Sequence, residues 1–265
     1  MTPAPEPAAG GTAICLIART NSTRLPRKVL QPVGDATLIE LLMRRLAQSR
    51  LARSVVLCTS THPDDAVLLE LARANGIEAL AGSEDEPLDR LLDAARLTGA
   101  TSVVRVTGDD PLIDGALCDR LIELHERVGA DYTRVEGVPL GLSPEVMRVD
   151  ALVRCRETLP AGQSEYLTVF MFDPDRYRCA VLGWPEDLSD YSLTVDYPAD
   201  YERLLGIVRD TDGSIPAILD HVRGDATCRI SREELLKMPG GTRMTYGAFR
   251  AWMEERAGRS HLEAA

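Results

Sequence analysis

The sequence predicts an α/β fold built on a largely parallel sheet, and three observations indicate this. Short apolar segments typical of buried strands recur along the chain, and patterns typical of amphipathic helices lie between them. Strands that alternate with helices favour parallel pairing, with helices covering both faces of the sheet. The chain has 265 residues, of which 45% are hydrophobic, which is enough for one large domain with a small appendage.

The first part of the chain predicts strands and helices in regular alternation. The expected strands are Ala13–Ala18, Ser54–Thr59, Ile77–Leu80 and Ser102–Thr107. The expected helices are Thr37–Gln48, Asp64–Asn75, Glu86–Thr98 and Gly115–Val128. In a sheet of this kind ligands bind beyond the carboxyl ends of the strands, so polar residues at those ends are the first candidates for a site.

From about Asp131 the alternation gives way to a mixed pattern, which we interpret as an extension of the same domain. The expected strands are Asp131–Val135, Pro144–Val149, Arg178–Leu182 and Ser192–Val195, and the expected helices are Asp150–Thr158 and Pro198–Arg209. The last stretch reads as helices interrupted at Pro239-Gly240-Gly241. We therefore expect a disordered tail over 1–11, a main domain over 12–212 and a C-terminal helical extension over 213–265.

Composition excludes several classes of protein. The net charge of −11 argues against a broad nucleic-acid footprint. No apolar run approaches the ~20 residues of a membrane span, and the start of the chain lacks the pattern of a signal peptide. The six cysteines are scattered and form no C-x-x-C pair. We expect a cytoplasmic protein with reduced cysteines.

The most informative segment is a basic loop between Ala18 and Leu30, which places four cations within ten residues of an acidic chain. A strand, a polar basic loop and a helix in that order is where α/β proteins bind phosphate. Arg and Lys contact phosphate oxygens directly, while hydroxyl and backbone N–H groups add further donors. The expected cations are Arg19, Arg24 and Lys28, and the expected hydroxyl donors are Ser22 and Thr23.

Two further polar clusters follow predicted strands. Gly108, Asp109 and Asp110 come after one strand, and Asp196 comes after another. Carboxylates at strand ends suit a divalent cation, because Mg²⁺ prefers carboxylate and phosphate oxygens. We assign Asp109 to a metal, with Asp196 completing a two-carboxylate site. Asp110 is closer to an ordinary helix cap, which is also an alternative for the other two carboxylates.

The segment from Gly82 to Arg90 is also consistent with a plain helix start, since a Ser followed by acidic residues caps a helix well. Arg90 is then either a surface cation or a ligand contact. The four histidines show no metal-ligand spacing, and no P-loop, G-x-S-x-G or G-x-G-x-x-G motif is present. Hydrolase, kinase and dinucleotide-binding interpretations therefore lack support.

Taken together, four motifs resemble the acylneuraminate cytidylyltransferase superfamily, and within it the branch of the spore coat polysaccharide biosynthesis protein SpsF. Members of that branch read A-R-x-G-S-T-R-L-P-x-K, G-S-E-D-x-x-L-D-R, R-x-T-G-D-x-P-L-I-D and T-V-D-x-P-x-D in this order. The matching residues are Arg19 with Ser22–Pro26 and Lys28, Gly82–Asp85 with Leu88–Arg90, Arg105 with Thr107–Asp109 and Pro111–Asp114, and Thr194–Asp196 with Pro198 and Asp200.

The resemblance implies a Rossmann-like, GT-A-like nucleotidyltransferase: a three-layer sandwich with a mostly parallel mixed sheet. It implies that CMP passes from CTP to a small hydroxyl-bearing acid, sugar or phosphonate, with release of pyrophosphate and with Mg²⁺ as cofactor. By the resemblance, the triphosphate meets Arg19, Arg24 and Lys28, and Mg²⁺ meets Asp109 and Asp196. Nucleoside contacts fall on Ser83, Asp89 and Arg90, and a homodimer is implied.

The chain departs from the family pattern in two places. In the phosphate loop, Asn21 and Arg27 stand where glycines are usual; Asn tolerates left-handed dihedrals, so we expect the loop to be kept. In the acceptor half, Ser143 replaces an Asp, and the segment around Ser164–Phe170 lacks the usual Arg and His. We therefore expect an acceptor other than a sialic-type acid, with Glu145 and Glu165 as candidate contacts.

Three alternatives stay open at this point. One is a nucleotidyltransferase with a uridylyl or guanylyl donor, because backbone groups largely select the base. Another is a catalytically silent nucleotide-binding scaffold, against which the intact Lys28, Asp109 and Asp196 argue. The third is a nucleotide-sugar-dependent glycosyltransferase with a D-x-D motif, which Asp173-Pro174-Asp175 fits by letter but not by its place after a helix pattern.

Overall fold

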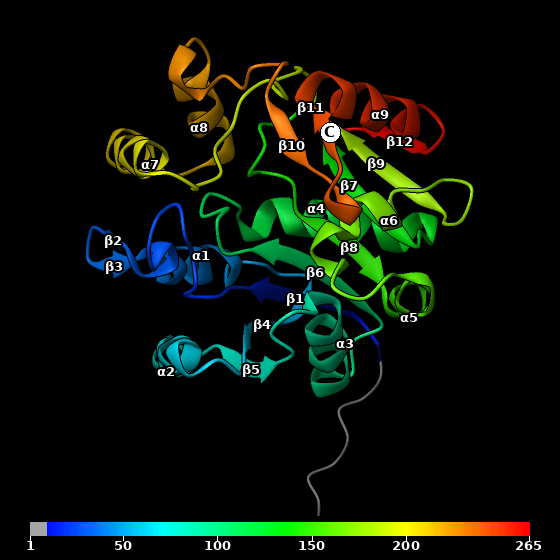
Figure 1. The fold of residues 1–265 in the computed structure, drawn as a ribbon, viewed down its shortest axis with the longest axis horizontal. Helices are drawn as coiled ribbons and strands as arrows, with labels where there is room; N and C mark the ends of the chain where they lie inside the picture. The colour runs from blue at the N-terminus through cyan, green and yellow to red at the C-terminus, as the bar shows by residue number, and fades with distance from the viewer. Residues whose placement is uncertain (1–9) are drawn as a thin grey trace, which may run out of the picture.

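A central eight-stranded sheet with helices on both faces forms the molecule (Figure 1). The computed structural model describes residues 10–265, so residues 1–9 of the predicted tail lie outside the described part. The strand order is β12-β9-β7-β8-β6-β1-β4-β5. Seven strands run in one direction and β8 runs against them, so the predicted three-layer α/β fold with a mostly parallel mixed sheet is confirmed.

The parallel half of the sheet follows the expected alternation. Its strands are β1 (Thr12–Ile17), β4 (Ala52–Ser60), β5 (Glu78–Gly82) and β6 (Ser102–Thr107), and its helices are α1 (Leu38–Leu46), α2 (Ala66–Ala74), α3 (Pro87–Thr98) and α4 (Gly115–Val128). Because β1 pairs in parallel with both β4 and β6, the carboxyl ends of these strands share one edge. That edge is where the sequence places its polar candidates.

The second half of the sheet is mixed. Its strands are β7 (Tyr132–Glu136), β8 (Glu145–Arg148), β9 (Cys179–Gly183) and β12 (His261–Ala264). Strand β8 pairs antiparallel with β6 and β7, whereas β9 pairs in parallel with β7 and β12. The helices of this half are α5 (Val149–Thr158), α6 (Leu167–Met171), α7 (Pro198–Asp210), α8 (Ile215–Val222) and α9 (Tyr246–Gly258).

Two apolar cores cover the two faces of the sheet. Ile14 and Leu16 of β1 belong to one core, while the intervening Cys15 belongs to the other, as strand alternation requires. The first core contains side chains of α1, α2, α4, α7 and α8. The second contains side chains of α3, α5, α6 and α9. Burial on both faces explains why the parallel strands read as continuous apolar runs.

Two predictions of secondary structure are wrong. Residues Ser192–Val195 form no strand, because their backbone bonds run to the loop residues Leu140 and Asp109 and give only isolated bridges. The stretch 213–265 is not helical throughout, since it also holds a hairpin and β12. The hairpin strands are β10 (Leu235–Lys237) and β11 (Arg243–Thr245), and the short helix η5 (Pro239–Gly241), read as a helix break, is its turn.

Several short elements are absent from the prediction because they span only two or three residues. They are η1 (Lys28–Leu30), the β2 (Pro32–Val33) and β3 (Ala36–Thr37) hairpin, η2 (Pro63–Asp65), η3 (Ser164–Tyr166) and η4 (Ala226–Cys228). Within residues 10–265, no helix combines the length and apolar character that crossing a membrane requires. All six cysteines are buried and unpaired, including Cys15 and Cys58, which lie in β1 and β4.

Candidate active site

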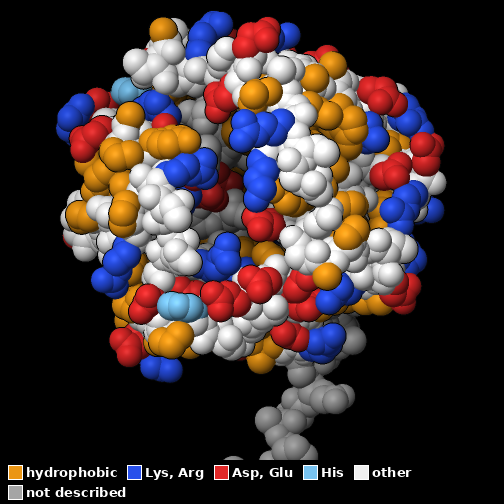
Figure 2. All heavy atoms as spheres, viewed as in Figure 1, with side chains coloured by type: hydrophobic (Ala, Val, Ile, Leu, Met, Phe, Trp, Pro, Cys, Tyr) orange, Lys and Arg blue, Asp and Glu red, His pale blue; other side chains and the backbone are white. Residues whose placement is uncertain are grey.

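A cavity of about 810 Å³ opens at the carboxyl ends of β1 and β6. Figure 2 shows this side of the molecule hollowed near its centre, with acidic side chains inside the hollow and basic side chains around it. Its polar and charged lining comes from segments far apart in the sequence: Arg19, Asn21, Ser22, Thr23, Arg24, Lys28, Arg90, Arg105, Thr107, Asp109, Glu165, Asp196 and Lys237.

The start of the basic loop is held by a buried carboxylate. Asp65 Oδ1 accepts hydrogen bonds from Thr20 N at 2.8 Å and from Thr20 Oγ1 at 2.6 Å, and its Oδ2 accepts one from Ser60 Oγ at 2.5 Å. Burial alone would raise the pKa of Asp65, but these hydrogen bonds keep it below its ordinary value. Asp65 is therefore a charged anchor that fixes the loop against β4, a role that no sequence motif predicts.

Lys28 joins the two predicted metal carboxylates. Its Nζ lies 3.1 Å from Asp109 Oδ2 and 2.7 Å from Asp196 Oδ1, and Arg24 Nη2 lies 2.8 Å from the same Asp196 oxygen. Burial lowers the pKa of Lys28, but the two carboxylates raise it above its ordinary value. Burial raises the pKa of Asp109, but Lys28 holds it below its ordinary value. At neutral pH the ammonium and the Asp109 carboxylate are thus both charged.

Two close backbone contacts bring Asp109 and Asp196 together. Gly108 N donates to Ile17 O at 2.8 Å, and a Cβ on Gly108 would lie 3.0 Å from the Ala18 side chain, so glycine lets β6 end close to β1. On the other side, Val195 N donates to Asp109 O at 2.8 Å. The chain before Asp196 is therefore bonded directly to the chain after β6, which replaces the strand pairing that the sequence suggests.

The chemistry of this pair fits a divalent cation. Both carboxylates converge on a point that a cationic group already occupies, and both are oxygen ligands of the type Mg²⁺ prefers. Within residues 10–265, no cluster of three or more His, Cys, Asp or Glu side chains could hold a metal by itself. A metal at this point would therefore take its remaining ligands from water and from a bound phosphate.

Of the nucleoside candidates, only Arg90 lines the cavity. Its side chain is buried, its Nη1 donates to Cys58 O at 3.3 Å, and burial together with the nearby Arg19 lowers its pKa. Ser83 Oγ instead accepts from Glu86 N at 3.2 Å at the start of α3. Asp89 accepts from Arg156 Nε at 2.6 Å. Ser83 and Asp89 therefore have structural roles, in agreement with the helix-start interpretation of this segment.

Glu145 lies behind the cavity wall, not in the cavity. Its Oε2 accepts from Arg105 Nη1 at 2.6 Å, its Oε1 accepts from Thr168 Oγ1 at 2.6 Å, and Tyr132 donates to it as well. Burial raises the pKa of Glu145, but Arg105 and Arg134 hold it below its ordinary value. Glu145 thus orients Arg105, which does line the cavity, and the expected direct contact of Glu145 with an acceptor is not supported.

The ion pair of Glu145 continues as a buried chain of charges that reaches the C-terminal helix. Arg134 Nη1 lies 3.7 Å from Glu145 Oε1, and Arg134 Nε lies 2.7 Å from Glu136 Oε1. Arg250 of α9 donates to Glu136 Oε2 at 2.8 Å. The wall that carries Arg105 is therefore connected through β8 and β7 to α9.

Glu165 and Lys237 complete the lining of the cavity. Glu165 lies in η3 and Lys237 at the end of β10. Glu165 is a candidate from the sequence. Lys237 is not, because no motif surrounds it and its hairpin lies far along the chain from the other site residues. Arg105 could have been found from strand alternation, since it lies two residues before Thr107 on β6 and both line the cavity.

The left-handed residue of the basic loop is Arg27, with φ 52°, and not Asn21. Arg27 is the only non-glycine residue with positive φ within residues 10–265, and it directly precedes η1. The loop therefore keeps its shape without a left-handed residue at position 21. The strained position is therefore that of Arg27, where a glycine is usual in the family.

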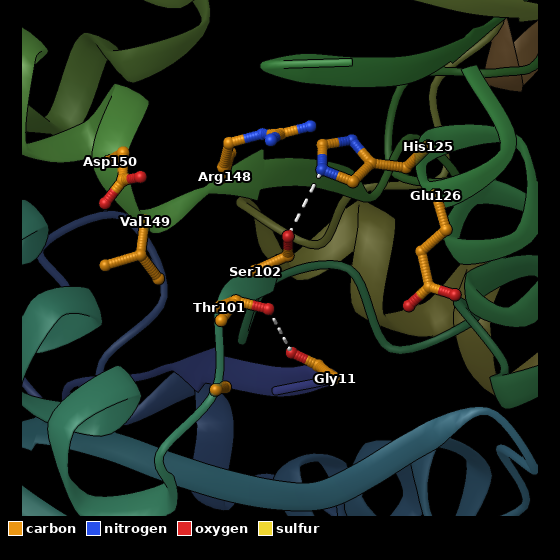
Figure 3. A pocket seen from close by; sticks show the side chains of 9 residues that line it. Gly11, Thr101, Ser102, His125, Glu126, Arg148, Val149 and Asp150 are labelled. Atoms are coloured by element: carbon orange, nitrogen blue, oxygen red, sulfur yellow. Dashed lines mark hydrogen bonds between the residues drawn. The ribbon is translucent and has the colours of Figure 1, made fainter. Parts of the chain in front are cut away.

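A second cavity, of about 730 Å³, lies at the opposite edge, where β1 and β6 begin. Figure 3 shows Ser102 and His125 facing each other there, with 3.3 Å between Ser102 Oγ and His125 Nε2. His125 Nδ1 is 2.8 Å from Thr133 Oγ1, and burial lowers the pKa of His125 to about 4. His125 is therefore a neutral, fully hydrogen-bonded side chain that serves packing.

Cations and carboxylates that converge in a cavity at the strand ends suit a phosphate-bearing ligand, and comparison with known proteins identifies the family. A family model described as Cytidylyltransferase matches residues 13–168. The spore coat polysaccharide biosynthesis protein SpsF of Bacillus subtilis is 33% identical over 196 residues, 71% of this chain and 82% of that protein. An uncharacterised protein of Methanocaldococcus jannaschii is 32% identical over 199 residues, 74% of this chain and 82% of that one.

Solved structures share the fold. A cytidylyltransferase from Leptospira borgpetersenii superposes with a TM-score of 0.74 at 24% identity, covering 83% of this chain and 96% of that one. The synthetase of CMP-2-keto-3-deoxy-manno-octonic acid, solved in complex with CTP, superposes with a TM-score of 0.61 at 16% identity, covering 75% and 98%. The chain belongs to the cytidylyltransferase family and is a nucleotidyltransferase enzyme.

Proposed function

We propose that this protein is a Mg²⁺-dependent cytidylyltransferase that transfers CMP from CTP to the hydroxyl group of a small acceptor and releases pyrophosphate. The observation that carries the proposal is the contact of Lys28 with both Asp109 and Asp196 in a cavity lined by further cations. Family membership supports CTP as the donor. The likeness to SpsF favours an acceptor destined for polysaccharide biosynthesis.

The basic loop would hold the triphosphate. Arg19, Arg24 and Lys28 line one side of the cavity, and Ser22 and Thr23 add hydroxyl and backbone donors. As the acceptor oxygen attacks the α-phosphorus, negative charge grows on the departing pyrophosphate. Fixed cations at that place stabilise the transition state more than the ground state, which is how such reactions are mainly accelerated.

Asp109 and Asp196 would hold Mg²⁺. When bound, the ion would neutralise phosphate charge and orient the α-phosphate. Lys28 already keeps the Asp109 carboxyl ionised, so this ligand is ready at neutral pH. With a metal between the carboxylates, the Lys28 ammonium would be released from them and could contact the phosphates of a bound triphosphate.

The two ends of the reaction would occupy different halves of the cavity. Arg90 and Gly108 line the half near β1, so we propose them as contacts on the nucleotide side. Arg105 and Glu165 line the same cavity, and we propose Glu165 as an acceptor contact. The acceptor would be a hydroxyl-bearing acid, sugar or phosphonate of small size.

The other predictions of the sequence belong to this proposal as well. The six unpaired buried cysteines support a reducing compartment, and so a cytoplasmic enzyme. A homodimer follows from the resemblance, and sedimentation would test it. The structure does not support the glycosyltransferase alternative. Asp173 accepts a hydrogen bond from Asp175 N, and Asp175 pairs with Arg259. Neither carboxylate lines the cavity.

Pyrophosphate release tests the proposal. The enzyme is given each nucleoside triphosphate with Mg²⁺ and a panel of acidic sugars, phosphonates, hydroxy acids and neutral sugars. We expect release with CTP alone, and no release without Mg²⁺. Efficient pyrophosphate release with another triphosphate would show that the donor is that nucleotide and not CTP. A protein that binds no nucleotide in a calorimetric titration would be a scaffold and not an enzyme of this kind.

A further inference from the structure

The cavity contains one cation that no protein group engages. Arg24 and Lys28 contact Asp196, Arg105 contacts Glu145, and the guanidinium groups of Arg19 and Arg90 donate to backbone carbonyls. Lys237 lines the same cavity, but its ammonium forms no hydrogen bond or ion pair with any residue of 10–265. Glu165, a carboxylate of the same cavity lining, is not paired with it either. The charge of Lys237 is thus available to a ligand.

The hairpin that carries Lys237 is firmly attached to the fold. Met238 is buried, and its N donates to Thr242 O at 2.9 Å across the turn. Tyr246 N donates to Glu234 O at 2.7 Å, and the Tyr246 hydroxyl donates to Ser189 O. Arg232 lies 2.9 Å from Asp190. These contacts tie β10 and β11 to the loop after β9, so Lys237 is presented by an ordered element.

The position of the hairpin indicates which reactant meets Lys237. The basic loop follows β1, and Arg90 comes from α3, which packs on β1, β4 and β5. The hairpin is attached on the β9 side, and Figure 1 shows it on the β7 and β9 half, away from α2 and β5. Asp109 follows β6, which stands in the sheet between β1 and the strands β8, β7 and β9, and Lys28 contacts both Asp109 and Asp196. A donor that fills the β1 side leaves the hairpin side to the acceptor.

We propose that Lys237 recognises an oxyanion of the acceptor, that is, a carboxylate, phosphate or phosphonate group. The proposal rests on the proposed function and adds a specificity-determining residue to it. An ammonium without a protein partner favours an anionic ligand group over a neutral hydroxyl, because it gains charge-assisted hydrogen bonds without breaking an existing ion pair. Lys237 also lies beyond residues 13–168, the part matched by the family model.

The test compares Lys237→Met and Lys237→Arg with Arg243→Met as a matched control. Arg243 faces Lys237 in the register of the same hairpin, carries the same charge and does not line the cavity. Each protein is first titrated calorimetrically with CTP and Mg²⁺. Methylphosphonate is then added to the CTP-saturated protein, and its binding is followed by broadening of its ³¹P resonance.

We expect CTP affinity within about twofold of wild type for all three variants. Methylphosphonate binding should fall about tenfold in Lys237→Met and persist in Lys237→Arg and Arg243→Met. For an acceptor found by the pyrophosphate assay, KM should rise about tenfold in Lys237→Met while KM for CTP stays unchanged.

Three results would overturn the proposal: no methylphosphonate binding by wild type, equal binding by Lys237→Met, or a tenfold loss of CTP affinity in that variant. A preferred acceptor without an anionic group would overturn it too. Failure of wild type to bind CTP would instead refute the proposed function. In that case methylphosphonate binding by wild type and by Lys237→Met would be compared without nucleotide, and this comparison would still decide the role of Lys237.

Discussion

Replacing Lys28 with Met should change metal binding and catalysis in opposite directions. Lys28 is the cation between Asp109 and Asp196, at 3.1 and 2.7 Å. In the free enzyme it competes with a divalent ion for these oxygens, whereas during turnover it is proposed to neutralise phosphate charge. Removing this ammonium should therefore tighten metal binding and slow catalysis.

The magnitudes follow from the geometry. At about 3 Å and an effective dielectric constant of about 20, each attraction is worth ~5 kcal/mol before desolvation. The carboxylate side chains are 33% and 20% exposed, so solvent screens them. Removing one member of a fully buried pair costs about 3–5 kcal/mol, and with this exposure we expect the free energy of unfolding to fall by about 1–3 kcal/mol.

The assay uses Mn²⁺ as a paramagnetic substitute for Mg²⁺. Without nucleotide, Lys28→Met should bind Mn²⁺ about tenfold more tightly than wild type, equivalent to ~1.4 kcal/mol. Its rate of pyrophosphate release should fall by about 10²–10³, as when a group that stabilises transition-state charge is removed. Arg44→Met, which removes an exposed cation paired with Asp35, should change neither quantity. Unchanged or weaker Mn²⁺ binding by Lys28→Met would refute this account of the carboxylate pair.

Three other substitutions test separate parts of the site. Asp196→Asn should lower the rate of pyrophosphate release at least about 100-fold while circular dichroism shows an intact fold, and an active variant would remove Asp196 from the metal site. Arg27→Gly should raise the free energy of unfolding by about 0.5–1 kcal/mol, because glycine accepts φ 52° without strain, and denaturant titration would show it. Glu145 has a lowered pKa in the fold, so it stabilises the protein above its ordinary pKa of 4.5 and ceases to do so as pH falls through the folded value. Glu145→Gln should therefore flatten the decline of Tm below about pH 4.5, and a decline as steep as in wild type would contradict this.

Much of the nucleotide half, from β1 to β6 with the basic loop, could be predicted because its sequence signals are local. Apolar strands, helix caps and the basic loop are each legible within a short window, and the rule that ligands lie at the carboxyl ends of parallel strands then brings Lys28 and Asp109 together. Asp196 does lie close to Lys28, but not at the end of a strand as predicted. Its segment is not a strand, and the hydrogen bond from Val195 N to Asp109 O does the work of strand pairing.

The acceptor half could not be predicted in the same way, because no local motif shows which groups its side chains contact. Glu145 looked like a ligand contact by sequence, but Arg105, Tyr132 and Thr168 already occupy its oxygens. Lys237 carries no motif, and the hairpin that positions it reads locally as interrupted helix. Short strands such as β10 are defined by the partner they pair with, which a window of sequence does not contain.

The pairing of β12 with β9 has a consequence for how the enzyme is made. After Gly183 the chain leaves the sheet, and at His261 it returns as β12, the strand next to β9. The excursion between these residues is therefore anchored in the sheet at both ends. That excursion supplies both Asp196 and Lys237 to the cavity. Synthesis runs from the N-terminus, so this excursion and β12 emerge from the ribosome after β1, β4, β5 and β6. During synthesis, therefore, the nucleotide half is expected to fold first, and a newly made molecule gains a complete site only after the β12 segment has left the ribosome.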